Sequence, residues 1–138
     1  MEITLKNKPE EKWKLLAALG DFVCAHQLPP AVVQAADLAL EEHLTNVMNY
    51  AYEDTREHEI VVRLETSASD LVIEVEDDGK PFDPTQSPEV DTSLPLDKKP
   101  IGGLGIHLIR RCMDHVGYKR QASRNVLRMV KRLPVAAL

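Results

Sequence analysis

Three short groups of residues in this sequence have side chains suited to chemistry. Glu42 and Asn46 stand four positions apart, an Asp-Asp-Gly triplet occupies 77–79, and a Gly-Gly-Leu-Gly segment occupies 102–105. A carboxylate can orient or deprotonate an attacking hydroxyl or water, and an amide oxygen is a hard ligand suited to Mg²⁺. Glycines before a helix leave its first backbone amides open to phosphate. Together the three groups indicate a nucleotide pocket.

Asp77 is the most informative of these residues. Leu71, Ile73 and Val75 mark the inward face of an alternating strand, and the next step of two places Asp77 on the same face. An ionised carboxylate that is buried without partners costs several kcal/mol, roughly. Asp77 should therefore meet a donor, which is either a protein amide or hydroxyl or the amino group of a bound base.

The segment around Glu42 and Asn46 predicts a helix with one polar side. The two residues lie one helical turn apart, and Asn49 and Glu53 continue the same side. A solvated helix face is the simpler interpretation of such a pattern. Most other positions of this helix are apolar or small, however, which favours a helix packed on several sides whose polar side borders a pocket.

The two glycine-containing groups are weak signals when each is taken alone. Most Asp-Gly pairs are simple turns, and a glycine cluster before a helix has many uses. Competing signatures are nevertheless absent from the sequence, which has no G-x-x-x-x-G-K-[ST], no G-x-G-x-x-G after a strand, no serine hydrolase elbow and no zinc signature.

The elements that must position these residues follow from hydrophobic periodicity. The expected order is strand, helix, helix, strand, strand, loop, helix, strand, strand, over residues 2–6, 9–28, 30–52, 59–66, 71–77, 81–100, 105–115, 116–121 and 126–133. Neighbouring strands in runs favour an α/β fold of the two-layer sandwich class, with a mixed, mainly antiparallel sheet and the helices on one face. The predicted apolar positions of the first two helices are Leu15, Leu16, Leu19, Phe22, Val23, Leu40, Leu44, Val47 and Ala51.

Length and composition limit the class of protein. The chain has 138 residues, which favours a single domain over 1–138, and five of its nine prolines fall at 81–100, where we expect a functional lid or a disordered segment. The net charge of -5 argues against nucleic acid or a membrane as the main partner. No secretory signal is apparent, and Cys24 and Cys112 resemble reduced core residues, so we expect a cytoplasmic protein.

The three groups also carry a resemblance. Glu42-x-x-x-Asn46, then Asp77-x-Gly79-x-Pro81-Phe82, then a glycine segment from Ile101 to Arg110, resemble the Bergerat-type ATP-binding fold of gyrase, histidine kinases and the heat-shock chaperone. The bacterial anti-sigma-factor serine/threonine kinases are the most similar branch. Proline in place of a second glycine at position 81 is common in that branch. The resemblance covers nearly the whole chain.

The resemblance implies a role for each matching position. It makes Glu42 the catalytic base, Asn46 the Mg²⁺ ligand and Asp77 the acceptor for the adenine amino group, with residues 81–101 as an ATP lid. The residues that it implies for ATP binding are Asn46, Asn49, Asp77, Gly79, Pro81, Phe82, Lys99, Gly102, Gly103, Leu104, Gly105 and Ile106.

The function implied is an ATP-dependent serine/threonine protein kinase that also acts as an anti-sigma regulatory factor. Its expected partners are a small anti-sigma-factor antagonist, which accepts the phosphoryl group, a sigma factor that competes for the kinase, and a second copy in a homodimer. Phosphoryl transfer needs little from the protein beyond positioning and charge neutralisation. The alternative is a binding module that senses ATP or ADP in a partner-switching pathway and transfers no phosphate.

Overall fold

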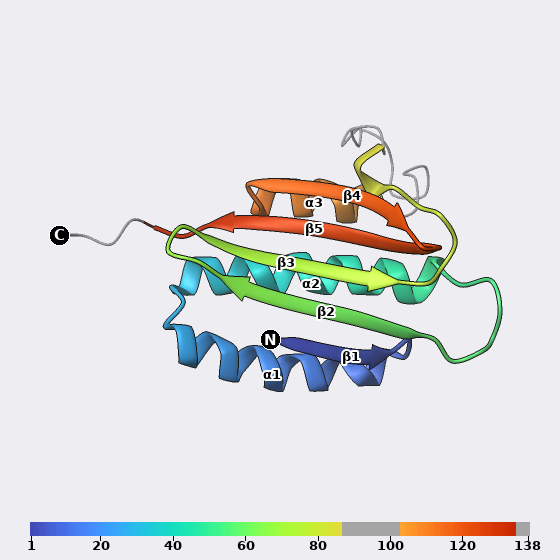
Figure 1. The fold of residues 1–138 in the computed structure, drawn as a ribbon, viewed down its shortest axis with the longest axis horizontal. Coiled ribbons are helices and arrows are strands. Elements are labelled where there is room, and N and C mark those ends of the chain that lie inside the picture. The colour runs from blue at the N-terminus through green and yellow to red at the C-terminus, as the bar shows by residue number, and fades with distance from the viewer. Residues whose placement is uncertain (87–102, 135–138) are drawn as a thin grey trace.

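The computed structural model describes residues 1–86 and 103–134, and this part of the chain forms one five-stranded sheet with helices on one side (Figure 1). The strand order is β1-β2-β3-β5-β4, and each neighbouring pair is antiparallel. The strands are β1 (Glu2–Lys6), β2 (Glu59–Thr66), β3 (Asp70–Asp77), β4 (His115–Gln121) and β5 (Arg124–Arg132). The predicted two-layer α/β sandwich is confirmed.

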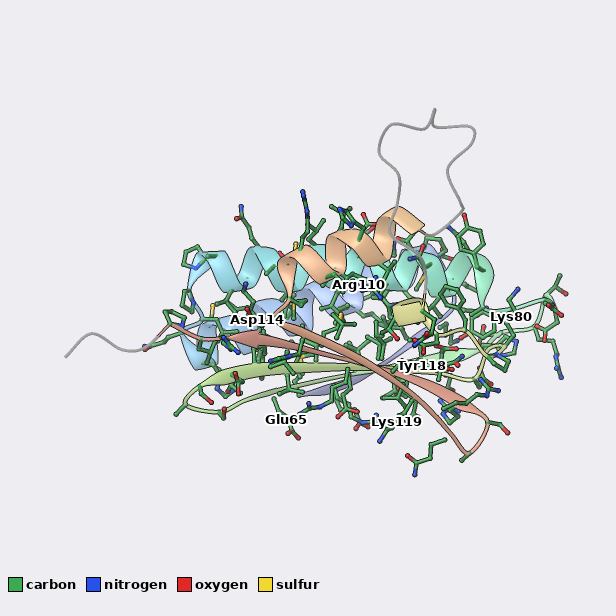
Figure 2. The ribbon with its side chains drawn as sticks, turned by 90° about the horizontal axis from the view of Figure 1, so that it is seen from above. Glu65, Lys80, Arg110, Asp114, Tyr118 and Lys119 are labelled. Carbon is green, nitrogen blue, oxygen red and sulfur yellow. The ribbon has the colours of Figure 1, made fainter. Side chains whose placement is uncertain are left out.

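Three α-helices cover the sheet, and Figure 2 shows them together on one side of it, away from the labelled side chains of Glu65 and Lys119. They are α1 (Lys12–His26), α2 (Pro30–Tyr50) and α3 (Gly103–Cys112), with short 3-10 helices η1 (Pro9–Glu11) and η2 (Pro84–Gln86). Proline opens both η1 and α2, where its missing N–H group and fixed φ angle suit the first turn. None of the helices within the described ranges is long and apolar enough to cross a membrane.

The core lies between the helices and the sheet, and strand alternation builds it. Leu71, Ile73 and Val75 are each 0 % exposed, as are Ile60, Val62 and Leu64 on β2. Residues of α2 pack on this apolar face, and the predicted Leu40, Leu44, Val47 and Ala51 are all buried. Burying this face accounts for most of the favourable free energy of such a fold.

Several predicted details are wrong, and each has a local cause. Leu16 is 65 % exposed because it lies on the outer side of α1, one turn from the exposed Trp13. Cys24 is also exposed and Cys112 is half-buried, so neither is a fully buried core residue. The last helix ends at Cys112 because His115 already pairs with Val130 of β5. Most of the predicted lid, residues 87–101, lies outside the described residues.

Candidate functional site

A cavity of about 290 Å³ lies between α2 and the ends of the central strands. This volume is near the lower end of the range for small-molecule sites, about 300–1,000 Å³. Figure 2 labels Lys80 and Tyr118, two of the lining residues, at the same end of the molecule. The full set is His43, Asn46, Val47, Tyr50, Ala51, Asp77, Lys80, Phe82, Pro84, Tyr118, Asn125 and Leu127.

Asp77 is the buried carboxylate of this cavity. It is 2 % exposed and ends the inward face of β3, as the alternation predicts. Its Oδ1 accepts hydrogen bonds from the Gly79 backbone N–H and from Asn125 Nδ2, both at 2.9 Å. Desolvation raises the pKa of Asp77, and the hydrogen bonds from Asn125 and Gly79 oppose that rise. Within the described ranges no hydrogen bond reaches Oδ2, so this oxygen has acceptor capacity left for a ligand.

Asn125 is the partner that sequence reasoning missed. It is 5 % exposed at the start of β5, directly opposite Asp77 in the sheet register. Its Nδ2 also donates to the Lys80 carbonyl at 2.9 Å, and its Oδ1 accepts from the Tyr118 hydroxyl at 2.5 Å and from Arg120 Nη1 at 3.0 Å. One amide therefore joins β3, β4, β5 and the chain after β3.

Strand alternation could have found Asn125. Leu127 and Met129 follow it at steps of two on the inward face of β5, and both are buried. A polar residue on an apolar strand face is the same signal that identified Asp77. Tyr118 gave no such signal, because β4 is an edge strand of half-buried and exposed residues.

Gly79 is required by the packing of the strand end on α2. A Cβ atom built at this position would lie 2.6 Å from both the Cβ and the carbonyl oxygen of Ala51, and 2.9 Å from Asp77 Oδ1. The backbone N–H of Lys80 donates to the same Ala51 carbonyl at 2.9 Å. Gly79 does not line the cavity itself, so its described role is close approach to the helix rather than to a ligand.

The cavity wall on α2 is made by His43, Asn46, Val47 and Tyr50, which share one side of the helix at spacings of three, one and three. His43 is 5 % exposed, and burial lowers its pKa to about 4. Sequence reasoning missed His43, although its spacing from Leu40, Leu44 and Val47 marks it as a buried position.

Only part of the predicted α2 set reaches this wall. Asn46 does, whereas Glu42 is half-buried and Asn49 is exposed, and neither lines the cavity. The reason is angular, because Glu42 and Asn49 lie toward the next side of the helix.

The remaining predicted residues have different outcomes. Phe82 lines the cavity and is 48 % exposed, while the exposed Pro81 does not line the cavity. Ile106 is 2 % exposed and belongs to the core. Gly103, Leu104 and Gly105 form the first turn of α3, two residues earlier than the predicted helix start. Lys99 and Gly102 lie outside the described residues.

A second polar cluster supports the chain beside the cavity. The His58 ring contacts Asp54 Oδ1 at 2.7 Å through Nε2 and Asp78 Oδ1 at 3.1 Å through Nδ1. It stacks on Tyr52 with ring centroids 4.2 Å apart. Asp78 is thereby held on the outer side while Asp77 points inward. The hydrogen bond that the His58 ring donates to the Asp54 carboxylate is the largest cause that raises the pKa of His58.

The donors at the cavity suit a nucleotide with its metal better than a metal alone. Across residues 1–86 and 103–134 no three His, Cys, Asp or Glu side chains gather where they could hold a metal ion. Asn46 offers a single amide oxygen, which fits Mg²⁺ because this ion takes most of its ligands from phosphates and water.

Comparison with known proteins identifies the type of domain. A model described as a histidine kinase-like ATPase domain matches residues 5–131. The chain is 28% identical to the serine/threonine-protein kinase BtrW of Bordetella bronchiseptica over 90 residues, which are 65% of this chain and 63% of that protein. It is 31% identical to the serine-protein kinase RsbW of Bacillus velezensis over 88 residues, 61% of this chain and 55% of that protein.

RsbW of Bacillus subtilis is 28% identical over 88 residues, with the same coverage of 61% and 55%. The chain thus spans less than two thirds of the length of these relatives. The family model, by contrast, covers nearly the whole fold, including both sides of the cavity. The chain belongs to the histidine kinase-like ATPase domain family.

Proposed function

We propose that this protein binds ATP with Mg²⁺ in the cavity and transfers the γ-phosphoryl group to a serine or threonine of a partner protein. The observation that carries the proposal is the buried Asp77, which lines the cavity with one carboxylate oxygen available. An anionic acceptor at an apolar wall suits the exocyclic amino group of adenine. The relatives are named as protein kinases, and this supports the transfer step.

Each side of the cavity has its own task in this proposal. Asp77 accepts a hydrogen bond from the adenine amino group, and Asn46 gives its amide oxygen to Mg²⁺. When bound, Mg²⁺ neutralises charge on the phosphates. Residues 81–101 serve as the lid of a single domain, and the α3 N-terminus lies against the phosphates with its unpaired amides.

The proposed acceptor is a small anti-sigma-factor antagonist, and a sigma factor competes with it for a homodimer of this chain. In the transfer step the acceptor hydroxyl oxygen forms a bond to the γ-phosphorus while the bond from that phosphorus to the ADP oxygen breaks. The hydroxyl proton passes to the Glu42 carboxylate. No other group of the protein changes its charge in this step.

The first experiment tests the pocket. Calorimetric titration with ATP, ADP and GTP, with and without Mg²⁺, should show binding of the adenine nucleotides and weaker binding of GTP, because its base presents an oxygen to Asp77. Wild-type protein that binds none of these nucleotides would remove the basis of the proposal.

The second experiment tests the transfer. Glu42→Gln keeps the size and hydrogen-bonding ability of the side chain but removes the base. Label from γ-labelled ATP should reach a cognate antagonist with the wild-type protein and not with the variant, at similar ATP affinity in calorimetry. The exposed Glu41→Gln is a matched control and should leave transfer unchanged.

One observation favours a second candidate function, a module that senses ATP or ADP without transferring phosphate. Glu42 is half-buried and does not line the cavity, so the proposed base does not border the proposed nucleotide site. Wild-type protein that captures antagonist in the presence of Mg·ATP and never labels it would establish this second function.

A further inference from the structure

His43 is a polar residue at a position where the fold otherwise places apolar ones. The other buried residues of α2 are valine, alanine or leucine. His43 is nevertheless 5 % exposed and borders the cavity together with Val47 of the helix and Leu127 of the sheet. A leucine would fill such a place without any desolvation cost, so the imidazole needs a compensating partner.

Hydrogen bonds within the protein do not supply that partner in the described part of the chain. None of the side-chain hydrogen bonds among residues 1–86 and 106–134 involves His43. Burial lowers its pKa to about 4, so at neutral pH the ring is uncharged. An uncharged imidazole carries one N–H donor and one nitrogen acceptor, and within the described ranges no side-chain hydrogen bond uses either of them.

The position of His43 favours the base of a nucleotide over its phosphates. Asp77 and His43 border the same cavity of about 290 Å³, so a flat ligand that reaches the Asp77 carboxylate occupies space that His43 also borders. A neutral ring among apolar side chains suits an uncharged heterocycle, whose ring nitrogens and amino group pair with one donor and one acceptor. Phosphate oxygens instead require cations or open backbone amides.

We propose that His43 contacts the purine base directly and acts with Asp77 as a second polar determinant of nucleotide recognition. This inference rests on the proposed ATP binding. It assigns the α2 wall a specific part in recognition, in which Asp77 accepts from the amino group while the imidazole pairs with another polar position on the base. His43 is a binding residue here and takes no part in phosphoryl transfer.

The test compares adenosine, ADP and ATP by calorimetry on the wild type and on His43→Leu, which keeps the volume but removes both hydrogen-bonding atoms. Loss of one neutral hydrogen bond weakens binding by about five- to tenfold, and we expect a similar factor for all three ligands because all three carry the same base. His115→Leu is the matched control, since His115 is exposed on the edge strand β4. It should bind all three ligands as the wild type does.

The outcomes separate this inference from the proposed function. Wild-type protein that binds no adenine nucleotide contradicts the proposed function itself. Wild-type affinity in His43→Leu contradicts only the role of His43, and so does weakening of ADP and ATP without weakening of adenosine, because that pattern indicates a phosphate contact.

A second measurement needs no variant and is independent of its folding. In ¹⁵N spectra of the wild-type protein, the His43 ring should stay neutral as the pH falls from 8 to 5. Saturation with adenosine at pH 7 should shift its ring nitrogens. Unchanged His43 nitrogen shifts at saturation would overturn the inference.

Discussion

At the scale of single residues, the two oxygens of the Asp77 carboxylate have different surroundings. Both hydrogen bonds from Gly79 and Asn125 reach Oδ1, and in the described part of the chain none reaches Oδ2. The hydrogen bonds of the fold therefore use Oδ1, and Oδ2 is available to a ligand. This division separates the contribution of Asp77 to stability from its contribution to binding.

Replacing Asp77 with asparagine tests that division. The amide oxygen of Asp77→Asn can still accept from Gly79 and Asn125, while the new NH₂ group faces the cavity and opposes the adenine amino group. We expect ATP affinity to fall at least about tenfold, and the free energy of unfolding to change by less than about 1 kcal/mol. Calorimetry and urea unfolding measure the two effects. Equal ATP affinity in both proteins would remove Asp77 from the binding site.

The opposite effect is predicted for Asn125, because its amide contributes to the stability of the fold. Asn125→Ala leaves the Asp77 carboxylate with one of its two donors and leaves the Lys80 carbonyl and Tyr118 hydroxyl without their partner. Unsatisfied buried groups of this kind predict a loss of about 2–3 kcal/mol in the free energy of unfolding.

Urea unfolding of Asn125→Ala beside Asn49→Ala provides the comparison. Asn49 is exposed on α2, so its replacement should change stability by about 0.5 kcal/mol or less. Equal unfolding midpoints for the two variants would show that the Asn125 hydrogen bonds contribute no net stability.

At the scale of elements, the end of β3 and the end of α2 meet at Gly79 and Ala51. Gly79→Ala adds a Cβ atom 2.6 Å from the Ala51 Cβ and carbonyl oxygen, so the strand end or the helix end must move. Overpacking of this kind costs about 1–3 kcal/mol. Gly117→Ala is the matched control, because nothing lies within 4 Å of a Cβ atom built there.

A double-mutant cycle identifies the cause of that loss. In an Ala51→Gly background the contact with the Ala51 Cβ disappears, while the contacts with the Ala51 carbonyl oxygen and with Asp77 Oδ1 remain. Gly79→Ala should therefore cost less there than in the wild type, yet more than nothing. An identical cost in both backgrounds would mean that the destabilisation of Gly79→Ala arises elsewhere.

Sequence periodicity predicted these elements well because most of them bury one clear face. Alternation located β2 and β3 to within one residue, and placed Asp77 inward correctly. It failed for Leu16, because α1 is apolar on its outer side as well as its inner side. The cavity was predictable only in part, since which side of α2 faces it depends on how the helix rotates against the sheet. That rotation selects His43 with Asn46 and turns Glu42 away.

At the scale of the whole molecule, the sheet face without helices carries a row of ion pairs. Glu2, Arg63, Glu76 and Arg124 form a chain of ion pairs across β1, β2, β3 and β5, with distances of 2.9, 3.5 and 2.7 Å. These side chains alternate with the buried residues of their strands, so they point away from the helices. Glu2 is exposed and the other three residues are half-buried. Ion pairs at the surface contribute about 0–1 kcal/mol each, which leaves most of the stability of the fold to its buried face.

Different titratable groups affect the stability of the protein in different pH ranges. Hydrogen bonds from neighbouring donors are the largest cause that lowers the pKa of four carboxylates, Glu11, Asp54, Glu57 and Asp114. Their stabilisation is complete above their unfolded pKa of about 4 and is lost below it. The raised pKa of His58 stabilises the fold at low pH, and this effect disappears as the pH rises. The raised pKa of Asp77 has the same sign.

Among these groups, His43 is the one that lowers the free energy of unfolding as the pH falls from about 6.5 to 4. Its pKa of about 4 in the folded protein is below the value of about 6.5 in an unfolded chain, so the unfolded state binds the proton first. Lowering the pH from 7.5 to 5 should therefore remove roughly 2 kcal/mol of stability through this residue. His43→Leu should lose that much less than the wild type in urea unfolding at the two pH values. Parallel pH profiles for wild type and His43→Leu would mean that the imidazole is already protonated or solvated in the folded protein, because only a buried neutral ring couples folding to acid in this range.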